Sequence, residues 1–423
     1  METLIVTCPF CGCLCDDVQL VLENGEVKEV KNGCAITKSL FRHHNQVDLS
    51  PEIEGKSVSL DEALDRATSI LKQARFPLIF GLSMTSCEAI RKAVELADFI
   101  GGNIDSTSTF CHGPTTLAMQ SVGEPTCTLG EIKNLADLVI FWGSNPVEAH
   151  PRHIGRYSVS PRGLFRPEGR RGRTVVTVDV RATPTARISD IFLQIHPHKD
   201  YEVFEVLRAL IKGKELNLES VGGISLETLK DLAFKMKSCK FGIIFFGMGL
   251  TMTRGRHLNI EAAISLVRDL NQFTKFLIMP MRGHYNVTGA DAVLTWQTGY
   301  PYALNFSRGY PQYNPGEFTT VDLLRRKEVD AALIMASDPM ANLPRQASSY
   351  LEKIPMIVLD CRRSYSSKFA TVFIPVAASG VNAPGTAYRM DGVPIQLKKV
   401  FDSPHPTDEQ VLERLLKRLR END

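Results

Sequence analysis

The sequence has almost no net charge. Its 49 basic side chains are balanced by 47 acidic ones, which leaves +2 at pH 7 with histidine neutral. General nucleic-acid binding needs a pronounced basic excess, so we do not expect it here. The sequence also lacks a long apolar run and an apolar leader behind Met1, whereas a membrane span needs about 20 consecutive apolar residues. We therefore expect a cytoplasmic chain that binds neither nucleic acid nor a membrane.

Internal repeats and low-complexity tracts are missing as well. With 43% hydrophobic and 23% charged residues, the composition is that of a soluble globular protein. A chain of 423 residues exceeds one ordinary core, which predicts about two or three domains. Half of the 10 cysteines are scattered singly and nothing indicates secretion. We therefore expect a reducing or anaerobic cytosol rather than a disulfide framework.

The other five cysteines gather near the N-terminus. Cys8, Cys11, Cys13 and Cys15 lie within one short loop, and Cys34 follows after a turn-rich gap. The spacing Cys8-x2-Cys11-x3-Cys15-x18-Cys34 suits a [4Fe-4S] cluster, because iron prefers soft thiolates and a tight loop directs three of them at one cube. Cys13 is then the spare thiol. Zinc stays open as an alternative, although it would more naturally pair two Cys-x2-Cys knuckles and the sequence has one.

Around these cysteines the pattern is that of short strands. Apolar runs at residues 3–6, 18–22 and 27–30, with Asn24-Gly25 before the last, predict a small β-hairpin that carries the cysteine loop. The next stretch, residues 35–47, is basic and polar and leads to Pro51, which we interpret as a domain boundary.

From residue 57 onward, helical and strand patterns alternate. Ser59 with Glu62, and Thr85 with Glu88, form capping-box patterns that predict two helix starts. Apolar strands that alternate with helices imply parallel sheets covered on both faces. Buried strands are predicted at 77–80, 138–142, 174–179, 241–246, 276–279, 331–336, 356–360 and 372–375, and further helices at 201–212, 259–272 and 407–420.

Small polar loops follow four of these strands. In open α/β sheets the ligand crevice lies beyond the carboxyl ends of the strands. Backbone amides in glycine loops suit phosphate, and an aspartate after a strand suits ribose hydroxyls or a guanine edge. Four such loops predict a large or paired nucleotide ligand. The candidate residues are Gly143, Ser144, Asn145, Asp179, Arg181, Thr183, Gly247, Gly249, Ser337 and Asp338.

The predicted fold class is α/β, with a small N-terminal β-hairpin iron-sulfur domain followed by two doubly wound α/β domains that have mostly parallel sheets. The expected segments are the [4Fe-4S] domain at 1–54, the first part of one cofactor-binding domain at 55–131, the second cofactor-binding domain at 132–285, and the remainder of the first at 286–423.

Two segments carry reactive side chains. Cys111-His112 lies in a glycine-proline loop and could be a soft metal ligand with a neighbouring proton carrier, a thiol nucleophile with a base, or an ordinary loop pair. Arg282, followed by Gly283 and His284, comes after a predicted strand. This arginine could clamp a carboxylate bidentately or form a surface ion pair.

Three other features leave alternatives open. The arginine-rich insertion at 161–173 is either a solvated loop or a docking surface for an acidic partner. One polar cluster could position phosphate or simply face solvent: His150, Arg152, His153 and Arg156. Four single cysteines are expected to be small buried hydrophobes: Cys87, Cys127, Cys239 and Cys361.

Several of these motifs together carry a family resemblance. The cysteine loop, Trp-Gly-Ser-Asn-Pro at 142–146, the segment from Asp179 to Ala186, the glycines 247 and 249, and the run 370–375 resemble the molybdopterin oxidoreductases with a bis-guanine-dinucleotide cofactor. Cys-Pro-Phe-Cys at 8–11, Cys-His-Gly-Pro at 111–114 and Gly-Thr-Ala-Tyr-Arg-Met-Asp-Gly at 385–392 resemble, within that group, the B subunits of formylmethanofuran dehydrogenases. These are molybdenum or tungsten enzymes of methanogenic and related archaea. The resemblance spans essentially the whole chain.

The resemblance implies roles for individual residues. Cys111 would be the protein ligand to tungsten or molybdenum, whose other sulfurs come from two molybdopterin guanine dinucleotides. His112 and Arg282 would flank the open position for carbon dioxide or formate. Lys38 would bridge cluster and pterin, and Cys13 departs from the small polar residue expected there. The cluster ligands would be Cys8, Cys11, Cys15 and Cys34, and the cofactor contacts would be the loop residues named above with Gly283 and His284.

The resemblance also implies an activity and partners. The chain would reduce carbon dioxide to formate reversibly, with low-potential electrons that enter through the cluster. An amidohydrolase-like A subunit would condense formate with methanofuran, a β-barrel subunit would complete the pterin site, and ferredoxin-like carriers would deliver the electrons. The rival interpretations are a general molybdopterin formate dehydrogenase and a metal-free scaffold subunit of a formyltransferase/hydrolase complex.

Overall fold

The computed structural model describes residues 1–44 and 49–421. They form two compact units. The first unit consists of Met1–Thr109, His284–Arg389 and Pro394–Asp423, and the second of Phe110–Gly283 and Met390–Val393. The chain enters the second unit after residue 109, whereas the predicted boundary follows residue 131. Among the described residues, no helix combines the length and apolarity that a membrane crossing requires.

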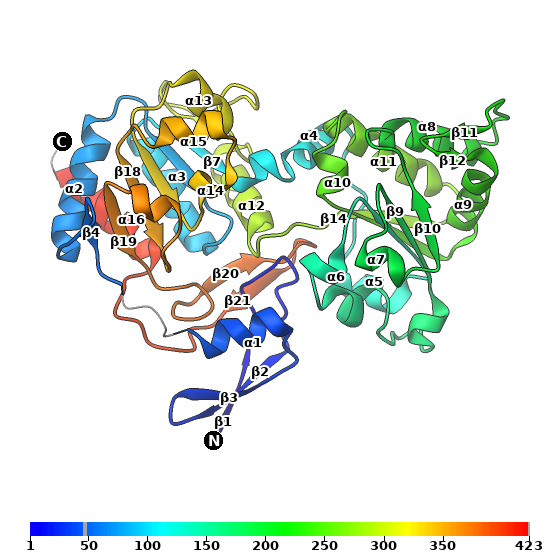
Figure 1. Cartoon of the computed structure of the whole chain (residues 1–423), viewed down its shortest axis with the longest axis horizontal. Helices are drawn as coiled ribbons and strands as arrows, with labels where there is room; N and C mark the ends of the chain where they lie inside the picture. The colour runs from blue at the N-terminus through cyan, green and yellow to red at the C-terminus, as the bar shows by residue number, and fades with distance from the viewer. Residues whose placement is uncertain (45–48, 422–423) are drawn as a thin grey trace. The chain divides into compact units, whose positions relative to one another are not determined.

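The N-terminal segment of the first unit is a three-stranded antiparallel sheet of β1 (Glu2–Val6), β2 (Val18–Glu23) and β3 (Glu26–Lys31) (Figure 1). Asn24 and Gly25 have φ angles of 53° and 80°. These left-handed values are what a two-residue type I′ turn requires. The predicted hairpin is therefore confirmed, with β1 as its third strand.

Helix α1 (Ala35–Arg42) follows this sheet, in the basic stretch where no helix was predicted. Part of that stretch, residues 45–47, lies outside the described residues. The helix begins at an unusual cap, because the sulfur of Cys34 accepts a hydrogen bond from the N–H of Thr37 at 3.5 Å. Ser, Thr, Asp and Asn are the usual N-cap residues, so a search of the sequence for N-cap residues does not find a helix start at Cys34.

The main sheet of the first unit has nine strands, of which the central five are parallel. The chain moves from β6 to β7 in one direction across the sheet and from β17 through β18 to β19 in the other, so the strand order reverses between β6 and β17. Across the sheet the strands are β16 (Gln312–Tyr313), β15 (Leu304–Asn305), β7 (Asn103–Ser106), β6 (Leu78–Gly81), β17 (Ala332–Met335), β18 (Met356–Asp360), β19 (Val372–Pro375), β4 (Glu52–Ile53) and β5 (Lys56–Ser57).

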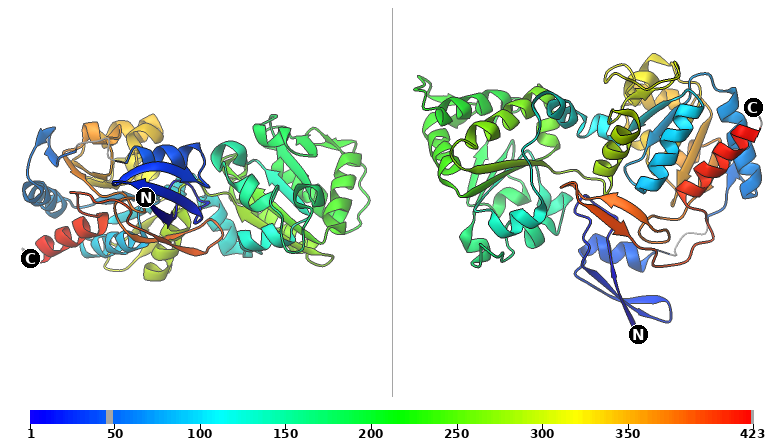
Figure 2. Two further views of the ribbon diagram at one scale, coloured as in Figure 1. Left: turned by 90° about the horizontal axis from the view of Figure 1, so that it is seen from below. Right: turned by 180° about the vertical axis from the view of Figure 1, so that it is seen from behind.

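Helices cover both faces of this sheet (Figure 2). On one face α2 (Leu60–Gln73), α16 (Asp408–Glu421), α3 (Cys87–Phe99) and α12 (Val287–Thr298) pack side by side, and α13 (Thr320–Arg326), α14 (Pro339–Asn342) and α15 (Arg345–Leu351) lie on the other. Ser59 and Glu62 form the predicted capping box at α2. A two-stranded antiparallel ribbon of β20 (Gly385–Tyr388) and β21 (Pro394–Leu397) completes the unit.

The second predicted capping box is wrong. Helix α3 begins after Ser86, whose hydroxyl accepts from a backbone N–H of the first turn. The Thr85 hydroxyl instead donates to the buried carboxylate of Asp408 at 2.7 Å, and Glu88 accepts from the N–H of Thr386 at 2.9 Å. Both side chains thus bond to residues far away in the sequence, and a capping-box pattern of four consecutive residues cannot reveal such contacts.

The sheet of the second unit consists of five parallel strands in the order β10-β9-β8-β13-β14. The chain moves from β8 outward to β10 and then from β13 outward to β14, so the order reverses between β8 and β13. The strands are β8 (Leu138–Trp142), β9 (Thr174–Asp179), β10 (Ile191–Gln194), β13 (Phe241–Phe246) and β14 (Lys275–Pro280). The bounds of β8, β9 and β13 are those that the sequence predicted.

Helices flank this sheet on both faces as well (Figure 1). They are α4 (Gly113–Val122), α8 (Asp200–Ile211), α9 (Leu226–Ser238), α10 (Met248–Thr251) and α11 (His257–Leu270), with the shorter α5 (Leu129–Leu135), α6 (Pro146–Ala149) and α7 (Pro184–Arg187). A small hairpin of β11 (Ser220–Val221) and β12 (Ile224–Ser225) precedes α9. Both units therefore have the doubly wound architecture predicted from the sequence.

Candidate active site

The cysteine loop joins β1 to β2 in the first unit. Two backbone hydrogen bonds of 3.0 Å close it, one from the N–H of Cys8 to the carbonyl of Cys15 and one from Leu14 to Cys11. The thiols of Cys8 and Cys15 are buried, whereas those of Cys11 and Cys34 are half-buried.

The predicted cluster ligands surround Cys8. The Thr37 hydroxyl lies 3.2 Å from Sγ of Cys8 and 3.2 Å from Sγ of Cys34, which brings both thiols to one point. The pKa of the Cys8 thiol is raised to about 12: burial is the largest cause, the hydrogen bond with Thr37 opposes it, and the charges of Cys11, Cys15 and Cys34 add to it. The cysteines that raise the pKa of Cys8, namely Cys11, Cys15 and Cys34, are the other three ligands that the sequence spacing predicts.

Cys13 occupies a different position in the loop. Its buried side chain hydrogen-bonds to Cys11 and thereby lowers the pKa of Cys11. Within residues 1–44 and 49–421, no three His, Cys, Asp or Glu side chains converge as ligands of a single metal ion would.

Lys38 and His284 border this loop. Lys38 is exposed and lies in the first turn of α1, where its N–H donates to the carbonyl of Cys34 at 3.0 Å. His284 forms an isolated antiparallel bridge with Cys11. Its Nδ1 lies 3.2 Å from the hydroxyl of Thr107, which in turn bonds to the hydroxyl of Ser83. Burial lowers the pKa of His284, so its imidazole is neutral.

Ser83 and Thr107 were not predicted as site residues. They follow β6 and β7, so their position after strands was the signal that could have identified them. Ser337 and Asp338 follow β17 as predicted, next to the point where the strand order reverses. The Asp338 carboxylate already accepts from the N–H groups of Tyr365 and Ser366 and from the Ser366 hydroxyl. Asp338 therefore has a structural role within its own unit.

In the second unit, three predicted glycines meet where the strand order reverses. Gly143 follows β8 with a φ of 55°, and its carbonyl accepts from the N–H of Gly249 at 3.0 Å. A Cβ on Gly249 would lie 2.7 Å from Cα of Gly143, and one on Gly247 would lie 2.7 Å from the Gly143 carbonyl oxygen. Only glycine permits this approach. Ser144 is buried beside them and donates to the carbonyl of Phe245 at 3.3 Å.

The loop after β9 lies next to this point. Asp179 is half-buried; burial raises the pKa of its carboxyl, while the N–H groups of Val180 and Arg181 oppose the rise. Thr183 caps α7. Asn145 joins this loop to the one after β8, because its Oδ1 accepts from the Thr185 hydroxyl at 2.7 Å. Asn145 and Thr185 thus hold the two loops together, while Asp179 and Arg181 lie at the carboxyl edge of the sheet.

Cys111, His112 and Arg282 all belong to the second unit. The carbonyl of Cys111 accepts from the Thr251 hydroxyl at 2.8 Å. His112 precedes α4 and is fully buried, with Nδ1 3.1 Å from the Thr115 hydroxyl. Its Nε2 has no hydrogen-bond partner among the described residues.

Arg282 follows β14 and is also buried, at 6% exposure. The pKa of His112 is lowered to about 3, mainly by burial and then by the charge of Arg282, while a backbone hydrogen bond with Met281 opposes the change. The neutral imidazole of His112 and the guanidinium of Arg282 therefore lie in the same buried part of the second unit. The surface-ion-pair interpretation of Arg282 does not fit this burial.

The cluster around His150 and His153 is buried rather than solvated, so the solvent-facing interpretation is wrong for both histidines. Nε2 of His150 donates to the carbonyl of Arg282 at 2.9 Å. The ring of His153 packs edge-on against Phe245, with 4.7 Å between centroids. Burial lowers the pKa of both imidazoles.

The arginine-rich insertion is only partly a solvated loop. Arg173 is buried and donates to the carbonyls of Val159, Pro161 and Lys133. Arg162 and Arg171 are exposed, as are Leu164 at 77% and Phe165 at 62%. Of the single cysteines, Cys87 is buried as predicted, whereas Cys127, Cys239 and Cys361 are half-buried.

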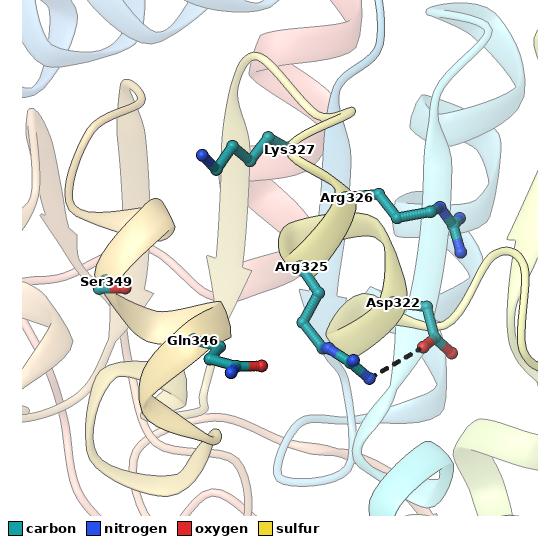
Figure 3. A pocket seen from close by; sticks show the side chains of 6 residues that line it. All are labelled: Asp322, Arg325, Arg326, Lys327, Gln346 and Ser349. Atoms are coloured by element: carbon teal, nitrogen blue, oxygen red, sulfur yellow. Dashed lines mark ion pairs between the residues drawn. The ribbon is translucent and has the colours of Figure 1, made fainter.

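One distinct hollow lies elsewhere, on the surface of α13 and α15 in the first unit (Figure 3). It measures about 540 Å³ and contains no residue that the sequence analysis selected. Its open, basic lining pairs Arg325 with Asp322 at 4.0 Å. We do not assign the chemistry to this hollow, because the reactive side chains are not in it. It is lined by Asp322, Arg325, Arg326, Lys327, Gln346 and Ser349.

Comparison with known proteins places these features in a family context. The family model described as Molybdopterin oxidoreductase matches residues 54–407. The chain is 48% identical to the B subunit of the tungsten-containing formylmethanofuran dehydrogenase 2 of Methanocaldococcus jannaschii, over 98% of both chains. It is 45% identical to the B subunit of the same name from Methanococcus maripaludis, also over 98% of both.

Among solved structures, one chain of the formyltransferase/hydrolase complex FhcABCD of Methylorubrum extorquens, crystallised with methylofuran, superposes with a TM-score of 0.73. It has 23% sequence identity, and the match covers 88% of this chain and 99% of that one. This likeness shows a shared fold.

Proposed function

The chain belongs to the molybdopterin oxidoreductase family and, within it, to the formylmethanofuran dehydrogenase B subunits, and from this membership we propose that it interconverts carbon dioxide and formate at a tungsten or molybdenum bis-pterin centre. The observation that carries the proposal is the grouping of Cys111, neutral His112 and buried Arg282 in the second unit. A soft ligand, a proton carrier and a carboxylate-binding cation are the three parts that this reaction needs.

The residues of the second unit fit a pterin dinucleotide. The crossing of Gly143, Gly247 and Gly249 exposes backbone without Cβ atoms at the reversal point of the sheet, where doubly wound folds bind dinucleotides. Asp179 at the end of β9 suits a guanine or ribose edge. The half-buried thiol of Cys111 suits a metal that also takes dithiolene sulfur.

When bound, the metal-pterin centre would supply the redox chemistry: it would accept the two electrons of formate oxidation and donate two electrons in the reduction of carbon dioxide. Arg282 would hold the substrate carboxylate, and its charge would stabilise negative charge on the oxygens. His112 would pass the proton on within the buried site, since its imidazole is neutral. Burial of both residues keeps water away from the reacting carbon.

The cysteine loop would serve electron transfer. Cys8, Cys11, Cys15 and Cys34 would hold a [4Fe-4S] cluster through which two low-potential electrons enter or leave. Lys38, which follows Cys34 in α1, would connect the cluster to a pterin. Gly283, His284, Ser337 and Asp338 would contribute to cofactor binding.

Partners would complete the reaction. An amidohydrolase-like A subunit would condense formate with methanofuran, a β-barrel subunit would complete the pterin site, and ferredoxin-like proteins would carry electrons. A metal-free scaffold is the second candidate, because a chain of the formyltransferase/hydrolase complex has this fold at a TM-score of 0.73. The five N-terminal cysteines and Cys111 argue against it, since a scaffold requires none of them.

Replacement of Cys111 tests the proposal. In Cys111→Ala we expect viologen-linked formate oxidation to fall by at least about 10³-fold, since loss of an essential metal ligand removes most of the catalytic acceleration. Tungsten or molybdenum should be lost while iron is retained. Cys239→Ala is the matched control, because Cys239 is also half-buried in the second unit and donates to the carbonyl of Met236. Undiminished formate oxidation in Cys111→Ala would refute the metal-ligand role.

A further inference from the structure

Glu124 lies between two elements that lead to the candidate active site. Helix α4 begins directly after His112 and ends at Gly123, which has a φ of 74° and donates to the carbonyl of Met119 at 2.9 Å. On the other side of Glu124, the carbonyl of Pro125 accepts from the N–H of Ile278 in β14 at 3.0 Å. The backbone of Glu124 is thus fixed between α4 and the strand that precedes Arg282.

The carboxyl group of Glu124 has an oxygen in the interior of the second unit. Its Oε1 is buried and has no hydrogen-bond partner within the described parts of the chain. The residue as a whole, backbone included, is half-buried. A buried acceptor without a partner is costly, which makes protonation of this carboxyl favourable.

Among the described residues, Arg282 is the charged side chain that changes the pKa of Glu124. Burial raises the pKa of Glu124 to about 7, and the positive charge of Arg282 works against this rise. Both protonation states are therefore accessible near neutral pH, as efficient proton transfer requires.

We propose that Glu124 carries the proton of the reaction between the buried region around Arg282 and solvent. The inference rests on the proposed interconversion of carbon dioxide and formate. Oxidation of formate breaks its C–H bond and yields carbon dioxide, two electrons and one proton. The electrons leave through the redox centre to an external acceptor such as a viologen. The proton converts the Glu124 carboxylate to the carboxylic acid, which then releases it to water.

His150 is the competing candidate and is less suited to this role. Its Nε2 donates to the carbonyl of Arg282 at 2.9 Å, which leaves only Nδ1 as an acceptor. The side chain is only 2% exposed, and burial lowers its pKa. His150 therefore remains neutral and holds the backbone of Arg282, whereas Glu124 is the less enclosed residue of the two.

The test compares Glu124→Gln, Glu124→Asp and the control Glu215→Gln in the purified complex. Glu215 is exposed and far along the chain in a surface segment. Formate oxidation with a viologen is measured across pH, together with tungsten, molybdenum and iron content. We expect Glu124→Gln to lower kcat by roughly 10², with KM for formate within about twofold and metal content unchanged. Glu124→Asp should retain more activity and shift the inflection of the pH profile, and Glu215→Gln should match the parent.

The outcomes separate this inference from the proposed function. Wild-type kcat and an unchanged pH profile in metal-replete Glu124→Gln would overturn the proton-carrying role and leave the proposed function intact. A raised KM with an unchanged pH inflection would also overturn it, since this is the effect of a residue that only orients Arg282. If Glu124→Gln loses its metals, the Glu124→Asp profile decides: a shifted inflection supports the role and an unshifted one contradicts it. Activity in Cys111→Ala would instead refute the proposed function.

Discussion

At the level of single residues, Thr37 organises the cysteine loop. Its hydroxyl lies 3.2 Å from the sulfurs of both Cys8 and Cys34, and its N–H donates to Cys34. One side chain of α1 thus connects the first and the last predicted cluster ligand. Hydrogen bonds to cluster sulfurs are among the factors that set reduction potential, so in the proposed [4Fe-4S] site Thr37 would tune the cluster as well as hold its ligands together.

The assignment of Cys13 as the spare thiol is tested by two single replacements. Cys13→Ser should retain the full iron content, because Cys13 is the spare thiol of the predicted spacing and its side chain bonds to Cys11. Cys15→Ser should lose the cluster, because the charge of Cys15 reaches Cys8. Iron counting and the visible absorption of the cluster distinguish the two. A complete cluster in Cys15→Ser would contradict the assignment.

Asp408 should make the stability of the first unit depend on pH. Its carboxylate is buried at the start of α16 and accepts from Thr85 at 2.7 Å. Its pKa is raised to about 7, mainly by burial and in part by the charge of Asp360, while the hydrogen bond from Thr85 opposes the rise. The unfolded chain releases this proton near its ordinary pKa of about 3.9, so the folded state binds more protons between about pH 4 and 7. Stability is therefore lost as pH rises through this window.

Asp408→Asn should remove this contribution. The amide cannot ionise, so the drop in the free energy of unfolding between pH 5 and 8 should shrink by up to a few kcal/mol, at about 1.4 kcal/mol per pKa unit. Urea titrations at both pH values measure it. Asp98→Asn is the control, because Asp98 is exposed on α3 of the same unit. An equal pH dependence in parent and Asp408→Asn would refute this origin.

At the level of elements, the loops after β8 and β13 depend on glycine. A Cβ on Gly249 would lie 2.7 Å from both Cα and the carbonyl oxygen of Gly143, and backbone atoms cannot rotate away. Gly249→Ala should therefore destabilise the protein by about 1–3 kcal/mol, the usual cost of overpacking. Thermal unfolding measures this change.

Gly130→Ala is the matched control for that replacement. Gly130 lies in α5, where a Cβ would meet only the Thr128 hydroxyl at an ordinary 3.7 Å. Alanine is favoured over glycine in a helix by roughly 0.5–1 kcal/mol, so this variant should be as stable as the parent or slightly more stable. Equal stability losses in the two variants would contradict the proposed close approach.

The strands were predictable from the sequence and several helix starts were not. Runs such as Phe241–Phe246 are apolar at every position because both faces of a parallel strand are covered. The start of α1 was missed because a cysteine sulfur caps it. The start of α3 was misplaced because Thr85 serves Asp408 instead of its own helix. Arg173 was interpreted as solvated because its three carbonyl partners come from distant segments.

At the level of the whole molecule, each unit repeats one architecture. Both main sheets reverse their strand order once, between β6 and β17 and between β8 and β13. The predicted loop residues follow these and neighbouring strands, since glycine and small polar residues after strands are visible in a sequence. Burial of His112, Arg282 and Glu124 was not visible, because it depends on which elements pack around them.

The most direct test of the central claim is the tungsten, molybdenum and iron content of the purified chain beside that of Cys111→Ala. The account predicts about one tungsten or molybdenum atom per chain in the parent, bound through soft sulfur ligands, and its loss from the variant with iron unchanged. A parent chain that carries neither tungsten nor molybdenum, or a variant that keeps the metal, would contradict the claim.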